Sequence, residues 1–144
     1  MQLTKASAPW HLWWIGTLAV LWNAIGCLDY LASQFQVESY LAQFTPEQRE
    51  FFRGFPAWVV ASWALAVWGS LAGSLGLLLR RSWALYAFLL AAAGMAITSV
   101  HNFLIMDGAG IMGPGGVAFS ALIWVVAVVL IVYCARMKRR NILR

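Results

Sequence analysis

Six polar side chains that lie in or beside apolar stretches of this 144-residue chain are the first candidates for chemistry. They are Asn23, Asp29, Arg53, Thr98, His101 and Asn102. A carboxylate at a bilayer centre costs roughly 2.5–3.5 kcal/mol on insertion scales and less near the surface, so Asp29 needs an explanation. A histidine next to it would form a proton-sensitive pair, because the ordinary pKa of histidine lies at about 6.5.

Asp29 and His101 are expected at the same depth in the membrane. Asp29 follows Trp10 by 19 residues, and His101 follows Trp83 by 18 residues. At a rise of about 1.5 Å per residue, both side chains lie roughly 27–28 Å from the start of their helices. The sequence therefore predicts an outward-facing polar pocket built on an Asp29–His101 pair. Two further residues, Thr98 and Asn102, lie within one turn of the histidine, and Arg53 lies in an adjacent outer connection.

A second interpretation of the same residues stays open. Asp29 and His101 would then lie in the hydrated interface and simply tie two helices together. Asn23 lies deeper in the first apolar stretch, where an amide is expected to form hydrogen bonds between helices rather than to contact a substrate.

The composition indicates the class of protein in which these residues lie. Hydrophobic residues make up 62% of the chain and charged residues only 10%, against about 25% charged in soluble domains. This predicts an integral membrane protein with the lipid bilayer as its partner. The net charge of +5 does not indicate a nucleic-acid partner, because no basic groove with interleaved aromatic residues is present.

Four apolar stretches are long enough to cross a bilayer at about 20 residues each. We predict an all-α membrane protein, one domain over residues 1–144, with a bundle of four transmembrane helices at approximately 10–31, 56–79, 83–106 and 117–134. The longest connection carries a capping box with Thr45, Pro46 and Gln48, which predicts a short helix lying along the membrane interface.

Glycines indicate where helices approach each other and where the chain turns. Small residues recur every four positions in the second span, and Gly69, Gly73 and Gly76 are predicted to pack against another helix or against a second copy of the chain. The glycine-rich segment 107–116 is predicted to be a flexible turn. It lacks the Gly-Lys-Ser/Thr end of a phosphate-binding loop, so we do not interpret it as one.

The charges predict an orientation. With four spans, Lys5, Arg80, Arg81 and the basic residues after position 135 fall on one side, and every carboxylate falls at or near the other. The positive-inside rule then places both termini in the cytoplasm and the two longer connections outside.

Several blocks of sequence resemble a known family. Leu21–Gly26, Phe55–Trp58, Leu71–Gly76 and Gly113–Gly116 are similar to a family of small bacterial inner-membrane proteins with four spans. Members of that family are often labelled "sugar transporter". The layout is also similar to that of DoxX-like four-helix proteins. The resemblance implies a multi-pass protein of the bacterial inner membrane.

No nucleophile–base pair, metal cluster or pair of carboxylates is evident, so we predict a protein that is not an enzyme and has no metal or cofactor. Three functions remain, one of which is a redox accessory role like that of DoxX-like proteins. The first is a transporter or binder of a small solute through the outer polar pocket; four helices are few for a transport path, so transport would call for a homodimer. The alternative is a non-catalytic accessory or assembly subunit of a larger membrane complex.

Overall fold

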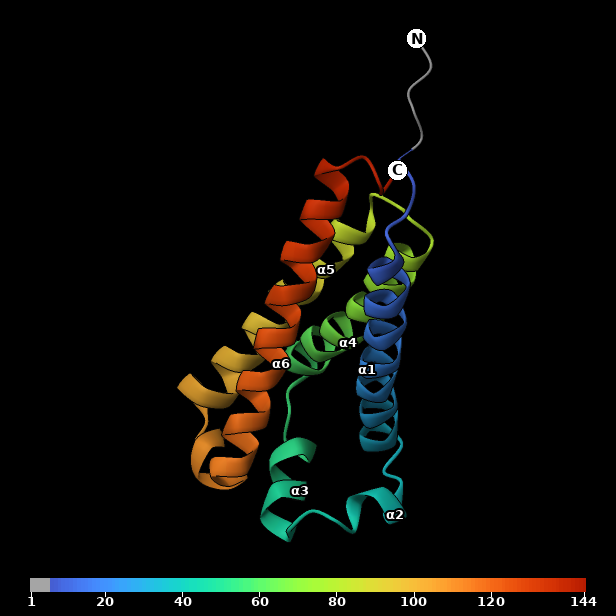
Figure 1. The fold of residues 1–144 in the computed structure, drawn as a ribbon. Helices are drawn as coiled ribbons and strands as arrows, with labels where there is room; N and C mark the ends of the chain where they lie inside the picture. Colours follow the sequence, from blue (N-terminus) through green and yellow to red (C-terminus); the bar gives the residue numbers. More distant parts are fainter. Residues whose placement is uncertain (1–5) are drawn as a thin grey trace.

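The structure, a computed structural model, describes residues 6–144, and those residues form helices and loops without any strand. Four helices are long and apolar enough to cross a membrane, which confirms the predicted fold class. They are α1 (Trp10–Gln34), α4 (Ala57–Leu78), α5 (Ala84–Val100), which continues into a π-helical turn at His101–Ile105, and α6 (Gly108–Arg139) (Figure 1). Two short helices, α2 (Glu38–Leu41) and α3 (Pro46–Arg53), connect α1 to α4.

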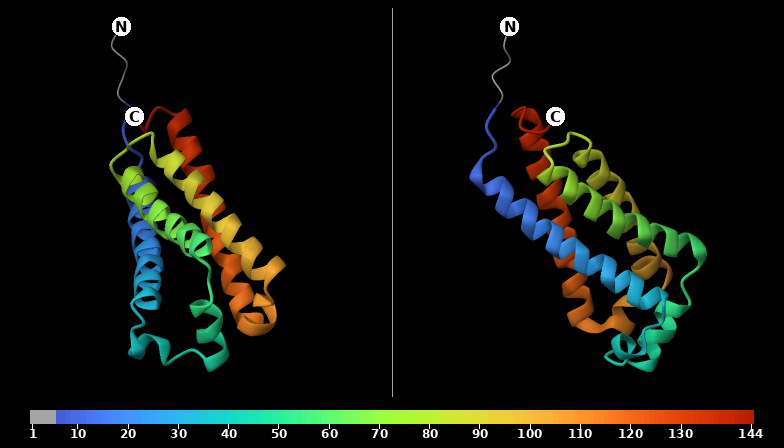
Figure 2. Two further views of the ribbon diagram at one scale, coloured as in Figure 1. Left: turned by 180° about the vertical axis from the view of Figure 1, so that it is seen from behind. Right: turned by 90° about the vertical axis from the view of Figure 1, so that its right-hand side faces the viewer.

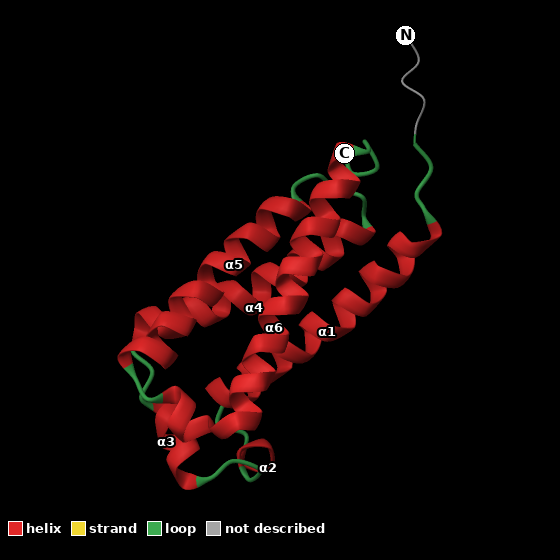
Figure 3. Ribbon diagram, turned by 60° about the vertical axis from the view of Figure 1, so that its left-hand side comes forward, coloured by secondary structure: helices red, strands yellow, loops and turns green. Residues whose placement is uncertain are grey.

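The long helices form a bundle with α4 at its centre. Helix α4 packs against both α1 and α5, and α6 packs along α5 (Figures 1 and 2). The short helices α2 and α3 lie together at one end of the bundle, and residues 6–9 and the C-terminal tail lie at the other end (Figure 3). The fold therefore places the α1–α4 connection and the C-terminal tail at opposite ends of the bundle.

Glycines allow the close contact between α4 and α5. A methyl group added at Gly94 would lie 2.5 Å from the carbonyl oxygen of Ser62, and one at Gly73 would lie 2.9 Å from the ring of Phe88. Gly69 and Gly76 likewise face α5, where added methyl groups would lie 3.2 Å from Ala91 and 2.8 Å from Trp83. The predicted packing role of these glycines is thus confirmed, but their face is covered inside the chain and is not available to a second copy.

The glycine-rich segment 107–116 differs from the predicted turn, because most of it is helical. Asp107 caps the first turn of α6 by accepting a hydrogen bond from the backbone nitrogen of Gly110 at 3.1 Å. The helix then kinks at Gly113, whose φ of 74° is in the region that favours glycine. Pro114 follows, and its missing N–H suits the first turn after a break.

The short helix predicted after Thr45 is present as α3. The side chain of Thr45 accepts from the backbone nitrogen of Gln48 at 3.2 Å, and the side chain of Gln48 accepts from the backbone of Thr45 at 3.1 Å. The sequence did not indicate α2, which begins after a left-handed residue at Gln36 with φ 53°.

Arg80 joins three segments at the end of the bundle that holds the termini. Its backbone has a left-handed φ of 57°, as the tight turn between α4 and α5 requires. Its guanidinium donates to the carbonyl oxygens of Ala6 at 2.8 Å and Ile142 at 3.0 Å. Its own carbonyl accepts from the backbone nitrogen of Arg144 at 2.8 Å.

Candidate functional site

Asp29 lies near the end of α1, and its carboxylate accepts a hydrogen bond from the hydroxyl of Tyr40 in α2. Both side chains are half-buried. Burial raises the pKa of Tyr40, and the hydrogen bond to Asp29 and the charge of that carboxylate raise it further. The hydroxyl therefore stays protonated and keeps α2 fastened to α1.

His101 begins the π-helical turn that ends α5, where the backbone nitrogen of Met106 donates to the carbonyl of His101 at 2.9 Å. The imidazole is buried. Its Nδ1 lies 3.0 Å from the side-chain oxygen of Asn102. The rings of Phe55 and Trp58 meet it edge to face, with centroids 5.3 and 5.5 Å away. His101 is thus enclosed by aromatic rings and by its own neighbour.

The predicted Asp29–His101 pair is wrong. Within residues 6–144 the ion pairs are Arg49–Glu38 and Arg53–Glu50, and Asp29 and His101 have different partners. The expected equal depth did not pair the two residues, because the α1–α2 turn brings Tyr40 to Asp29 and Asn102 occupies Nδ1 of His101. Thr98 does not join His101 either, because its hydroxyl donates to the carbonyl of Gly94 one turn back at 3.0 Å.

A cavity of about 170 Å³ lies where the end of α1, α3 and the start of α4 meet. We call it the α3 cavity. Its lining residues are Ser33, Gln34, Gln36, Leu41, Arg49, Phe52, Arg53, Phe55, Val60 and Trp63. A single water needs about 10–15 Å³ on this measure, so the cavity has room for several water molecules and therefore for a small organic solute.

Two guanidinium groups line the α3 cavity, from positions four residues apart in α3. Arg49 pairs with Glu38 at 3.3 Å and donates to the carbonyl of Phe44 at 3.2 Å. Arg53 donates to the side-chain oxygen of Gln36 at 3.3 Å and pairs with Glu50 at 3.8 Å. A guanidinium has five N–H donors, so each retains donors for a ligand.

Aromatic rings form the apolar side of the same cavity. Phe52, Phe55 and Trp63 line it, with the two phenylalanine rings 5.7 Å apart and both within 6.5 Å of the indole. Because Phe55 also contacts His101, this wall continues into the aromatic surroundings of the histidine. Apolar and aromatic side chains together with a few polar donors are the usual lining of a small-molecule site.

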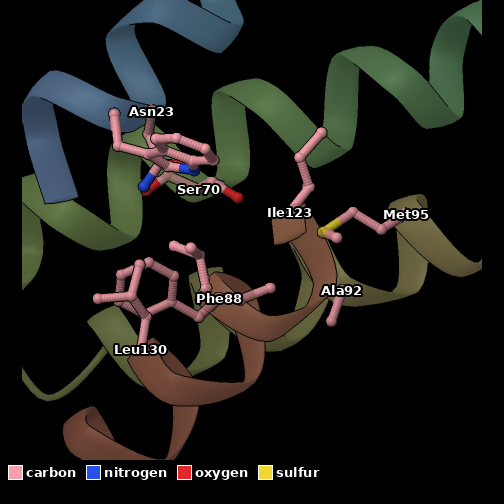
Figure 4. A pocket seen from close by; sticks show the side chains of 10 residues that line it. Asn23, Ser70, Phe88, Ala92, Met95, Ile123 and Leu130 are labelled. Atoms are coloured by element: carbon pink, nitrogen blue, oxygen red, sulfur yellow. The ribbon is translucent and has the colours of Figure 1, made fainter. Parts of the chain in front are cut away.

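Asn23 lies at a second, smaller cavity of about 30 Å³ in the middle of the bundle, between the four long helices (Figure 4). Its amide nitrogen donates to the hydroxyl of Ser74 at 2.8 Å and contacts the carbonyl of Ser70 at 3.4 Å. This confirms the predicted hydrogen bond between helices. The cavity has room for about two water molecules, which is too little for a solute.

Of the six predicted site residues, only Arg53 lines the α3 cavity. Arg49 and Gln36 were missed as lining residues, and Tyr40 was missed as the partner of Asp29. A signal for Arg49 was present, because residues four apart lie on one face of a helix and α3 itself was predicted. Gln36 and Tyr40 are positioned by the fold of the α1–α3 connection, which the sequence did not predict.

Comparison with known proteins adds no relative: the chain matches no family model, no curated protein and no solved structure. The resemblance to four-span proteins labelled "sugar transporter", and that to DoxX-like proteins, therefore stay predictions. Within residues 6–144, no group of three or more His, Cys, Asp or Glu residues could hold a metal ion.

Proposed function

We propose that this chain is a small integral membrane protein that binds a small polar solute in the α3 cavity. The observation that supports this is the lining of the cavity, which combines the guanidinium groups of Arg49 and Arg53 with the rings of Phe52, Phe55 and Trp63. The cavity also lies at one end of four helices that can span a membrane, where a solute could enter from water.

The lining defines the chemistry of the solute. Guanidinium and amide N–H groups donate to hydroxyl, carbonyl or carboxylate oxygens. Aromatic faces bind the apolar C–H face of a flat or ring-shaped molecule. A sugar ring or a sugar acid has both features, with oxygens around its edge and C–H groups on its faces.

Asp29 has a supporting role in this proposal. Its bond to Tyr40 fixes α2, and Leu41, the next residue of α2, is part of the cavity wall. The carboxylate then holds one wall in place and does not contact the solute. His101 supports another part of the lining through its contact with Phe55.

We further propose that the protein lies in the bacterial inner membrane with both termini in the cytoplasm, which makes the α3 cavity face outward. The support is the separation of charge along the bundle. Arg and Lys residues gather at the end with the termini, and the positive-inside rule assigns such an end to the cytoplasm.

Calorimetry on the full chain in detergent tests the proposal, with glucose, galactose and glucuronate as the solutes. We expect saturable binding of at least one solute and its loss in the double variant Arg49→Gln/Arg53→Gln. The matched control is Arg136→Gln/Arg139→Gln, which makes the same chemical change at the other end of the bundle. Binding that survives in the cavity variant would contradict the site.

A separate measurement distinguishes solute binding from the accessory role. An affinity-tagged chain purified in mild detergent is expected to run alone or with copies of itself. A stoichiometric partner protein, together with no saturable solute binding, would favour a subunit of a larger membrane complex. If a solute binds, counterflow of that solute in proteoliposomes shows whether it is also transported.

A further inference from the structure

The end of the bundle opposite the α3 cavity is strongly basic. Seven cationic residues lie on the turn between α4 and α5 and on the last turn of α6 and its tail: Arg80, Arg81, Arg136, Lys138, Arg139, Arg140 and Arg144. All five carboxylates of the chain lie elsewhere: Asp29, Glu38, Glu47, Glu50 and Asp107. No acidic side chain therefore offsets the positive charge at this end.

Two of the seven cations have structural roles. Arg80 donates to the carbonyls of Ala6 and Ile142, and Lys138 lies 3.0 Å from the hydroxyl of Tyr86 and 4.4 Å from the centre of its ring. The other five are exposed, and we call them the basic rim: Arg81, Arg136, Arg139, Arg140 and Arg144. Among residues 6–144, the ion pairs involve only Arg49 and Arg53, so no carboxylate neutralises the basic rim.

The length of α6 places the basic rim at the level of the lipid headgroups. Beyond the kink at Gly113, the helix runs for 26 residues from Pro114 to Arg139 and spans about 39 Å, whereas the hydrocarbon layer is about 30 Å thick. Its last turn therefore extends beyond the hydrocarbon. Trp10 and Trp83 are 74% and 45% exposed at the same end of the bundle, as is typical of residues at a membrane interface.

We propose that the basic rim is a binding site for the headgroups of anionic phospholipids. Arg136, Arg139 and Arg140 lie on one face of a helical turn, while Cys134 and Met137 on the other side are buried in the core. Guanidinium groups bind phosphate oxygens through paired hydrogen bonds. This site is independent of the solute proposed for the α3 cavity.

Quenching of tryptophan fluorescence by brominated lipids tests the proposal. The full chain is reconstituted in phosphatidylcholine vesicles that contain a minor fraction of dibrominated phosphatidylglycerol or, for comparison, dibrominated phosphatidylcholine. At low salt we expect phosphatidylglycerol to be preferred, by about fivefold for each cation in contact with a headgroup. The preference should fall as salt is raised, because the charges are exposed to solvent.

Variants separate the basic rim from the rest of the chain. Arg136→Gln/Arg139→Gln/Arg140→Gln should lose most of the preference, and the matching triple change to Lys should keep most of it. The control Arg49→Gln/Arg53→Gln removes charge from the opposite end, where we expect a loss of solute binding, and should keep the original preference for phosphatidylglycerol. Should the Gln variant fail to fold, the salt series and the Lys variant still decide the question.

Three results would overturn the proposal. The first is equal quenching by the two lipids at low salt. The second is a preference that neither salt nor the triple Gln change reduces. The third is displacement of phosphatidylglycerol by inorganic phosphate beyond the effect of chloride at equal ionic strength, which would indicate a site for free phosphate.

Discussion

The hydroxyl of Tyr40 in α2 donates a hydrogen bond to the carboxylate of Asp29 near the end of α1. This bond crosses the turn that contains the left-handed residue Gln36, and it makes the chain reverse direction above the membrane-spanning part of α1. Asp29, which the sequence made a candidate for a proton-sensitive group, therefore anchors the α1–α4 connection, and residues of that connection line the α3 cavity.

Tyr40 should ionise at a higher pH than an ordinary tyrosine, whose pKa is about 10. Its neutral hydroxyl is needed to donate to Asp29, so the α1–α2 contact is fully present below about pH 10 and is lost as the pH rises through the raised pKa. Near-ultraviolet titration of the original chain and of Tyr40→Phe gives the contribution of Tyr40 by difference. Asp29→Asn should lower its midpoint only partway, because burial is the largest cause of the shift. An unshifted midpoint in the original chain would contradict the contact.

Replacement of Asn23 by valine should destabilise the bundle. The change removes the hydrogen bond to Ser74 between α1 and α4, and such bonds in membrane proteins contribute about 0.6–1.7 kcal/mol. Thr98→Val is the control, because the hydroxyl of Thr98 bonds only to its own helix. Unfolding by a denaturing detergent compares the two, and equal loss in both variants would argue against a specific role for Asn23.

Gly94→Ala should be harmful although alanine favours helix. The new methyl group would lie 2.5 Å from the carbonyl oxygen of Ser62, and forcing α4 and α5 apart costs about 1–3 kcal/mol. Gly26→Ala places its methyl group 3.7 Å from Val67 and should be neutral or stabilising, because alanine exceeds glycine by about 1 kcal/mol in helices. Thermal unfolding in detergent gives both values, and a stable Gly94→Ala variant would mean that the helices are not so close.

A fluorescent protein fused after Arg144 should fold and fluoresce in a bacterial host, because we propose that the C-terminus lies in the cytoplasm. Cysteines introduced at Ser7 and Gln43, which are exposed at opposite ends, provide the independent check in intact cells. A membrane-impermeant thiol reagent should label the cysteine at position 43 and not the one at position 7. The reverse pattern would place the α3 cavity in the cytoplasm.

The four long helices and α3 could be predicted from the sequence because each depends on local signals. Runs of about 20 apolar residues identify the spans, and the Thr45–Gln48 capping box identifies the start of α3. The face formed by Gly69, Gly73 and Gly76 was also evident. The helix that covers that face could not be predicted, because small residues permit close packing but do not determine which helix packs against them.

The site was harder to predict because it depends on how a connection folds. Depth along a helix could be computed for Asp29 and His101, but the direction in which each side chain points depends on packing. The turn at Gln36 then brought Tyr40 to Asp29, and the aromatic residues Phe55 and Trp58 enclosed His101. The prediction of a flexible turn at segment 107–116 was wrong for a related reason, because a glycine-rich segment can be helical on both sides of a single kink.

The contacts of Arg80 also set an order of events during synthesis. Its guanidinium joins the carbonyl of Ala6, 74 residues earlier, to that of Ile142, 62 residues later. Helices α1, α4 and α5 have left the ribosome well before Ile142 has been made, so this end of the bundle cannot close until almost the whole described chain has emerged. The packing of α4 against α1 and α5 needs no residue of α6, so the closure at Arg80 is the last of these contacts that can form.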